Sequence, residues 1–502
     1  MSQPIGATSS TDNIAHAPSD PAQAPSSALP PSLVQSTSSE DRTTPMQELL
    51  DENARTRQIR AELRDILNVV LRAGQLLLEN SANTARVEDT MRRTAIALGA
   101  QSLDTHVTPT GIFVTIHSND EHRTRILRIV GHGVDLSRVE AVLEALHELE
   151  DGKFDRAQMA ARLEEIAKQP REYSKVFTAV SVGVAGASFC VLFGCGFWEF
   201  VVVFISGFLM QFIRAELNHR HANRLLMTGI VSAAVTCFAL LFTTLLNQNA
   251  EAIGALLPWL PTPHADPALA VAAGGILPIP GILMVSSIAD LFRGDTLAGM
   301  ARSTIALLTI FAISIGIWLV LLTIQMTTGL KLEIKTSSMP PILTTLIAGG
   351  FGAAGFGIVF DVPRRRIFFA GLVGSVATGV RWVAVQKGGI PLEAAALLAG
   401  IGIALISELW AMIFKAPTSM FTIAGFIPLV PGVFSFRAIL NFAEAKYTEG
   451  TTDMVRALLI TMSVAAGMGI VTAMTRIRPN APKQVVIARN SLNPSAATLE
   501  QP

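Results

Sequence analysis

Apolar residues dominate the chain from about residue 175 to residue 475, where ten stretches with little or no charge alternate with short polar segments. Each stretch, with its flanks, approaches the length of about 20 residues that an α-helix needs to cross a bilayer. Five stretches lie within residues 174–330 and five within residues 336–476. The pattern predicts an all-α polytopic membrane protein with about ten transmembrane helices, arranged as two five-helix repeats.

Polar positions are more frequent in the N-terminal third, and their spacing is that of a folded soluble domain. Apolar residues recur at helical spacing between Ile59 and Leu77 and between Val139 and Leu146. Two runs, Gly111–Ile116 and Arg123–Val130, have the composition and partial alternation of β-strands. Residues 46–173 are therefore predicted to form an N-terminal cytosolic α+β domain.

The two ends of the chain lack apolar runs. Residues 1–45 are rich in Ser, Pro, Ala, Thr and Gln, which is the composition of a disordered tail. No apolar core of a secretory signal follows a basic start in this segment. Residues 477–502 are predicted to be a cytosolic C-terminal tail.

Basic residues indicate the orientation of the predicted spans. If the α+β domain is cytosolic, the loops on its side carry the cluster Arg364–Arg366, whereas the opposite loop of residues 247–266 has no Lys or Arg. The positive-inside rule favours this arrangement. We expect a multi-pass protein of the cell (plasma) membrane with both termini in the cytoplasm. Because each half holds an odd number of spans, the second repeat would be inverted relative to the first.

Composition supports the membrane assignment and narrows the set of partners. Half of the 502 residues are apolar, 16% are charged and the mean hydropathy is +0.45, which is unusual for a soluble globular protein. The formal net charge is zero, so no nucleic-acid partner is expected. The three cysteines lie in apolar stretches, and we expect no metal site and no cofactor.

Proline and glycine interrupt the fourth apolar stretch of each half, at residues 275–281 and 425–432. Proline removes a helical donor and clashes with the preceding turn, so in lipid a break persists where protein, water or a ligand satisfies the freed backbone groups. Paired interrupted helices in two halves are typical of a secondary-transporter site. The residues predicted to bind substrate are Pro278, Pro280, Gly281, Ser286, Ser287, Pro428, Pro431, Gly432 and Arg437.

Helix ends at such a break carry opposite partial charges. A new helix N-terminus suits a carboxylate, and free carbonyls across the break suit an ammonium group. Two opposed breaks therefore suit a zwitterion. Ser286 and Ser287 could donate to such a ligand, or they could bond back to their own helix. The sequence leaves both readings open.

Carboxylates within or beside the apolar stretches are candidates for proton coupling, since a carboxylate at bilayer depth costs about 2.5–3.5 kcal/mol on insertion scales. Asp290 and Glu408 are the residues predicted to carry the coupling proton. Arg381 and Arg437 are candidate counter-charges. The other acidic candidates are Glu199, Asp361 and Glu393.

The sequence resembles the threonine/serine exporter family from about residue 55 to residue 478. The resemblance rests on the segment Asn80–Met91, on Thr108–Gly111 ahead of a strand, and on the Pro431-Gly432 element with Arg437 nearby. It implies a cytosolic domain followed by two five-span halves, which in some bacteria are separate chains. It also implies export of threonine and serine, but it brings no family-wide set of functional residues.

The patterns predict a secondary active transporter, not an enzyme, and the resemblance implies that it exports small neutral amino acids; we expect antiport with protons. No Walker loop is present, which argues against direct use of ATP. One alternative is an exporter of another small carboxylate or a short peptide. Small residues permit close helix packing, which is compatible with a homo-oligomer and equally with packing within one chain. They are Gly349, Gly350, Gly352 and Gly355.

A second alternative is a membrane-anchored hydrolase that uses the N-terminal domain. Nucleophile, base and orienting residues for such an enzyme would come from polar side chains near the two strands. The candidates are Asp104, His106, Thr110, Thr115, His117, Ser118 and Asp120. No Gly-x-Ser-x-Gly or His-Glu-x-x-His pattern accompanies them.

Overall fold

The computed structural model describes residues 44–118, 121–131, 133–219, 223–275, 277–278, 280–292, 294–329, 339–414 and 416–476. The chain divides into two units, residues 1–57 and residues 58–502. Of the first unit, the structure describes residues 44–57, which begin helix α1 (Thr44–Glu79). Nearly all of both predicted tails, residues 1–45 and 477–502, lies outside the described residues.

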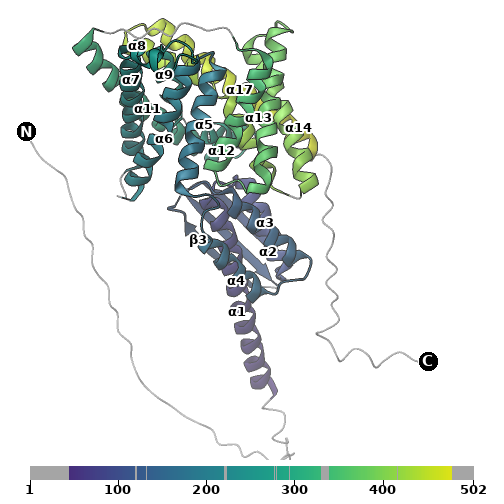
Figure 1. The fold of residues 1–502 in the computed structure, drawn as a ribbon. Coiled ribbons are helices and arrows are strands. Elements are labelled where there is room, and N and C mark those ends of the chain that lie inside the picture. The colour runs from purple at the N-terminus through teal and green to yellow at the C-terminus, as the bar shows by residue number, and fades with distance from the viewer. Residues whose placement is uncertain are drawn as a thin grey trace, which may run out of the picture. The chain divides into compact units, whose positions relative to one another are not determined.

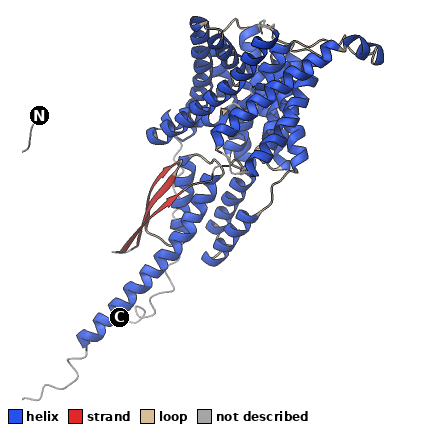
Figure 2. Ribbon diagram, turned by 90° about the vertical axis from the view of Figure 1, so that its left-hand side faces the viewer, coloured by secondary structure: helices blue, strands red, loops and turns tan. Residues whose placement is uncertain are grey.

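Helices and a small sheet form the chain between α1 and residue 174. The three strands are antiparallel in the order β1-β2-β3, and Ile112 of β2 pairs with Val107 of β1 and Leu127 of β3 (Figure 2). One apolar core joins the helices to the sheet, with Leu67, Met91 and Ile112 fully buried. The elements are α2 (Thr84–Ala97), β1 (Ser102–Thr108), β2 (Gly111–Ser118), β3 (Glu121–Arg128), α3 (Leu136–Glu150) and α4 (Arg156–Lys168).

The sequence predicted two of these strands and missed the third. β2 and β3 occupy the two expected runs, and β3 ends two residues earlier than expected, at Arg128. β1 has only Leu103 and Val107 as large apolar residues, so its own pattern is weak. Its position is fixed by pairing with residues 111–117 of β2, which no local signal reports.

Short polar side chains begin three of the helices in this part. Asn83 accepts a hydrogen bond from the Arg86 amide at the start of α2, and Asp135 accepts one from Arg138 at the start of α3. Asp155 and Gln158 form a reciprocal capping box at the start of α4. Each satisfies amide groups that have no partner within the first helical turn.

Long apolar helices make up the rest of the chain and lie side by side in a bundle (Figure 1). The first half contains α5 (Lys175–Leu192), α6 (Phe197–His219), α7 (Arg224–Gln248), α8 (Ala250–Leu256), α9 (Pro267–Gly275), α10 (Gly281–Phe292) and α11 (Thr296–Thr328). The second half contains α12 (Ile342–Val359), α13 (Arg364–Gln386), α14 (Leu392–Phe414), α15 (Thr418–Phe426), the 3₁₀ turn η1 (Ile427–Leu429), α16 (Gly432–Ala443) and α17 (Tyr447–Arg476). The chain is a polytopic all-α membrane protein with a small three-stranded sheet.

Eight helices in the described residues are long and apolar enough to cross a membrane, and one bent pair would make a ninth. The prediction of about ten spans counted each interrupted segment as one span. Here the fourth segment of each half is divided into two shorter helices, α9 with α10 and α15 with α16. The pair α15–η1 and α16 bends by 48°, and Ile276 and Ile279 of the other break lie outside the described residues.

The two halves have matching sets of packing partners. α5 packs on α6 as α12 packs on α13, α7 packs on α11 as α14 packs on α17, and α10 packs on α11 as α16 packs on α17. Glycines make the closest of these approaches. The Cα of Gly316 faces the Gly229 carbonyl between α11 and α7, and that of Gly467 faces the Leu397 carbonyl between α17 and α14. Such small residues allow helix backbones to approach closely in a membrane.

Candidate transport site at two broken helices

The first break separates α9 from α10. The Leu277 amide donates to the Gly274 carbonyl at 3.3 Å, and the Met284 amide donates to the Pro280 carbonyl at 3.1 Å. Proline at position 280 supplies no amide, so α10 begins without a helical bond at that position. Leu277 is buried and packs against Gly186 of α5 and Gly207 of α6, which anchors the break between two long helices.

The second break is buried along its whole length. Residues 424–432 are all buried, and η1 carries the chain from α15 toward α16. The Gly432 amide donates to the Val430 carbonyl at 2.8 Å, and both the amide and the hydroxyl of Ser435 donate to the Pro431 carbonyl at 3.1 Å. The protein itself therefore satisfies part of the backbone that the prolines release.

The structure brings the two breaks together, although about 150 residues separate them in the sequence. A methyl group on Gly281 would lie 3.2 Å from Cγ2 of Val430 and 3.6 Å from Cε1 of Phe426. Pro428 also approaches Gly352 of α12. The first of these contacts would be tighter than ordinary van der Waals contact, so a side chain at position 281 would require Val430 to shift. The start of α10 therefore lies directly against the second break.

The serines after the first break have unequal surroundings. Ser287 is buried, and its hydroxyl donates to the Met284 carbonyl at 2.8 Å. Ser286 is half-buried. The sequence left two interpretations of Ser287 open, ligand binding and a hydrogen bond back to its own helix. The structure has the second arrangement.

Asp290 lies at the far end of α10 in a buried ion pair with Arg302 of α11. Oδ2 of Asp290 is 3.0 Å from Nη1 of Arg302, and their side chains are 0% and 8% exposed. The sequence had suggested Arg381 and Arg437 as counter-charges, and Arg302 was missed. The sequence feature that could have identified Arg302 is the turn at Gly294 and Asp295. This turn folds α11 back against α10 and brings the two charges together.

Arg437 occupies a related position in the second half. Its Nε lies 3.3 Å from Oδ2 of Asp453 on α17, and Asn441 donates to the same oxygen at 3.0 Å. The Arg437 side chain is one-third exposed, whereas that of Asp453 is buried. Both helices that follow a break are thus joined to the next long helix by a charged pair, with the signs reversed.

Glu408 is half-buried near the end of α14. The Thr418 hydroxyl at the start of α15 donates to its Oε2 at 3.5 Å. Glu408 therefore touches the first residue of the helix that leads into the second break. Asp290 and Glu408 lie on different helices of different halves, and no measured contact joins them in the described residues.

The remaining acidic candidates have structural partners. Glu199 accepts a hydrogen bond of 2.7 Å from the Asp266 amide just before α9. Glu393 lies 3.9 Å from Arg456. Asp361 is buried in the turn between α12 and α13.

The segment Asn80–Met91 contacts the turn between α10 and α11. The Thr84 hydroxyl donates to Oδ2 of Asp295 at 3.2 Å, and Arg302 donates to the Ala82 carbonyl at 3.5 Å. Arg302 thus contacts both Asp290 and the start of α2. Glu88, one turn further along α2, accepts a hydrogen bond from the Val107 amide, and burial raises its pKa.

The hydrolase candidates lie on the sheet. His117 Nε2 is 3.1 Å from Oδ2 of Asp104 on the neighbouring strand, and the Thr115 and Thr124 hydroxyls are 2.9 Å apart. The Asp104 side chain is 81% exposed, so this pair is open to solvent. Asp120 lies outside the described residues.

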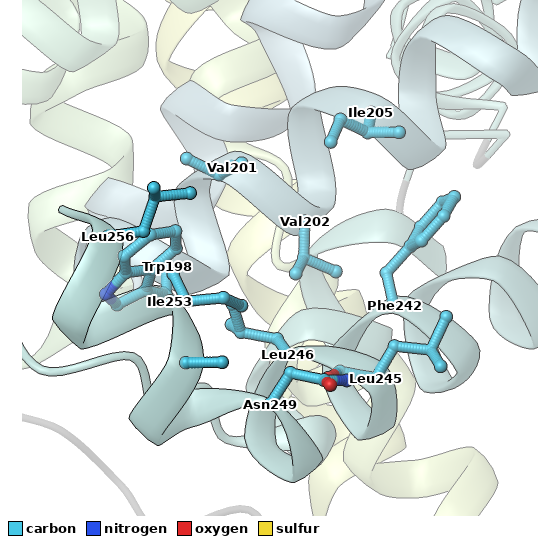
Figure 3. A pocket seen from close by; sticks show the side chains of 11 residues that line it. Trp198, Val201, Val202, Ile205, Phe242, Leu245, Leu246, Asn249, Ile253 and Leu256 are labelled. Atoms are coloured by element: carbon cyan, nitrogen blue, oxygen red, sulfur yellow. The ribbon is translucent and has the colours of Figure 1, made fainter.

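A pocket of about 520 Å³ lies elsewhere, between α6, α7 and α8 (Figure 3). Trp198, Phe242, Leu246 and Ile253 are among the side chains that line it, and Asn249 adds a polar group. None of the predicted site residues lines this pocket. The pocket is therefore separate from the paired breaks.

The apolar bundle and its broken helices define a polytopic membrane protein. Comparison with known families agrees. Residues 68–324 match the family described as "Putative threonine/serine exporter", and residues 345–474 match the family described as "Threonine/Serine exporter, ThrE". The chain belongs to the threonine/serine exporter family.

Several curated proteins are similar to this chain, and they are named as transporters or exporters. The "Probable threonine/serine exporter" of Mycobacterium tuberculosis is 24% identical over 81% of this chain and 75% of its own length. The "Threonine/serine exporter" of Corynebacterium glutamicum is 22% identical over 81% of this chain and 82% of its own length. The "Probable succinate transporter subunit YjjP" of Escherichia coli is 27% identical over 51% of this chain and 93% of its own length. No solved structure matches.

Proposed function

We propose that this protein is a secondary active transporter that exports small neutral amino acids, threonine and serine, across the cell membrane. The observation that carries the proposal is the contact between the two breaks, where Gly281 lies against Val430 and Phe426. Helix ends from both halves then converge on one region, which suits the carboxylate and the ammonium group of a zwitterion. Family membership and the two exporter relatives support this substrate class.

The proposed mechanism is alternating access by movement of one half against the other. Its support is the matching packing partners of the helices in the two halves. These features suit two inverted repeats around a central site. In this proposal the α+β part, residues 46–173, and both termini are cytoplasmic.

Proton coupling is the second part of the proposal, with Asp290 and Glu408 as the groups that bind the proton. Protonation of Asp290 would remove the charge that holds Arg302 and so loosen α10 from α11. Energetics allow such coupling: a tenfold gradient of a neutral solute costs about 1.4 kcal/mol, and one inward charge returns about 2.3 kcal/mol per 100 mV.

A second candidate substrate is a small dicarboxylate. The observation that favours it is the similarity to the protein named as a succinate transporter subunit. Arg437 is a guanidinium close to the second break, and guanidinium groups bind carboxylates in a bidentate way. The same relative is named a subunit, which supports a homo-oligomeric or multi-chain assembly as part of this proposal.

The experiment that tests the function is efflux of labelled threonine from cells preloaded with a threonine dipeptide. We expect faster efflux from cells that express the chain than from cells with an empty vector, and a protonophore should abolish the difference. Gly281→Val should reduce it by at least tenfold, whereas Gly469→Val should not, because among the described residues nothing beyond its own helix turn lies within 4 Å of a methyl group placed there. Competition by unlabelled serine but not by succinate would select the amino acid; the reverse would select the dicarboxylate.

A further inference from the structure

The start of α3 is bonded to the turn between α12 and α13. The Leu136 amide donates to the Phe360 carbonyl at 2.9 Å, and the Tyr173 hydroxyl donates to the Val362 carbonyl at 2.7 Å. Oε1 of Glu140 lies 3.4 Å from Arg366 and 3.5 Å from Arg365. These bonds join the α+β part to the second half of the bundle, while those of Thr84 and Arg302 join it to the first half.

Asp361 lies inside this junction in an unusual setting. Asp361 is 2% exposed, and its backbone φ is 52°. Among the described residues, no donor forms a hydrogen bond to its Oδ2. The guanidinium of Arg171, 3.6 Å away, is itself 62% exposed. A buried carboxylate oxygen without a hydrogen-bond donor makes the ionised form costly. The left-handed backbone is one that Asn and Asp tolerate better than other residues with a side chain.

Charged groups from two neighbouring segments face Asp361. They are Asp135 and Arg138 at the start of α3, where Asp135 is the residue just before the helix, and Arg171 and Glu172 of the segment before α5. Asp135 is held in place by the Ser137 hydroxyl at 2.7 Å and by Arg138 Nε at 3.1 Å. Burial, and then the charge of Asp135, raise the pKa of Asp361 to about 6.

We propose that this junction is a proton-operated latch, in which protonation of Asp361 tightens the contact between α3 and the α12–α13 turn. The direction of the pH effect follows from the linkage between protonation of Asp361 and closure of the junction. The ionised carboxylate is disfavoured in the closed junction, so closure gains stability as pH falls through about 6 and loses it as pH rises. Between about pH 7.5 and pH 5.5 the closed form should gain roughly fourfold over the open form.

A latch with this sign would limit transport when the cytosol becomes acidic. This consequence rests on the proposed function, since antiport with protons would carry protons into the cytosol. The α+β part contacts both halves. A tighter latch would therefore restrain their relative movement and slow export, and so oppose further acidification.

Hydrogen–deuterium exchange on the purified full-length protein in lipid nanodiscs tests the latch without any substrate. The readout is protection of the Leu136 amide, corrected for the intrinsic pH dependence of exchange. We expect protection to rise about fourfold between about pH 7.5 and pH 5.5 in the unmodified protein. Asp361→Asn, which suits the left-handed backbone, should give high protection that does not change with pH.

Two further variants complete the test. Asp135→Asn, which can still begin α3, should reduce the pH dependence, whereas Glu165→Gln at an exposed position of α4 should leave it unchanged. A pH-independent Leu136 amide in the unmodified protein, or an unchanged pH profile in Asp361→Asn, would overturn the latch. If the unmodified protein shows the expected pH dependence of Leu136 protection but exports no threonine, the proposed function fails while the latch stands.

Discussion

Asp290 of α10 and Arg302 of α11 form a buried ion pair, with 3.0 Å between Oδ2 and Nη1. Arg302 also donates to the Ala82 carbonyl ahead of α2. One guanidinium therefore links α10, the helix that follows the first break, to the segment Asn80–Met91 of the α+β part. Removal of one partner from a buried pair leaves the other charge uncompensated, whereas removal of both can be nearly neutral.

Asp290→Asn should destabilise the protein by about 3–5 kcal/mol, because Arg302 would then be buried without its counter-charge. The double variant Asp290→Asn with Arg302→Gln should recover most of this loss. Thermal unfolding in detergent measures both effects. Transport distinguishes the roles: if the double variant regains stability and also proton-driven export, Asp290 has only a structural role and our coupling proposal fails.

Glu408→Gln should abolish concentrative export while downhill exchange of threonine continues, because the amide cannot bind and release the coupling proton. Its effect on stability should be small, since within the described residues its carboxylate accepts a long bond, 3.5 Å, from the Thr418 hydroxyl. Proteoliposomes with an imposed pH gradient provide the measurement. Glu251→Gln, at an exposed position of α8, is the matched control and should export normally; concentrative export by Glu408→Gln would contradict the assignment.

Arg437→Gln should raise the apparent KM for the substrate by about tenfold or more, as expected for loss of a charged hydrogen bond of about 1.5–3 kcal/mol. The maximal rate per folded molecule should change little. A purely structural role for the Arg437–Asp453 pair predicts the opposite, with less folded protein and an unchanged KM. Arg437→Lys should restore the charge but not the fork geometry, and so recover affinity only in part.

Gly281→Val should reduce export by at least tenfold, because even the first methyl group would meet Val430 at 3.2 Å. Overpacking of this kind costs about 1–3 kcal/mol and would force the two breaks apart. Gly469→Val on α17 adds the same volume at a position where, in the described part of the chain, nothing beyond its own helix turn lies within 4 Å of the added methyl group. Equal activity of the two variants would show that the contact between the breaks is unimportant for transport.

The positions of the two breaks could be predicted from the sequence because their signals are local. Proline and glycine mark both breaks, and isolated carboxylates in apolar stretches identify Asp290 and Glu408 as unusual residues. The partners could not be predicted in this way. Arg302 lies on α11 and Asp453 on α17, the long helices that follow α10 and α16. Which charges meet depends on how each long helix is rotated about its axis against its neighbour.

The sequence alone determined the class of protein, the positions of the apolar helices and the two breaks, because hydrophobic burial and the missing amide of proline act through composition and local spacing. The tertiary structure decided which groups meet across distant segments. Strand β1 depends on β2, Gly281 depends on Val430, and Asp361 is buried because α3 covers its turn. Contacts of this kind depend on packing geometry summed over many residues, and no local pattern in the chain encodes them.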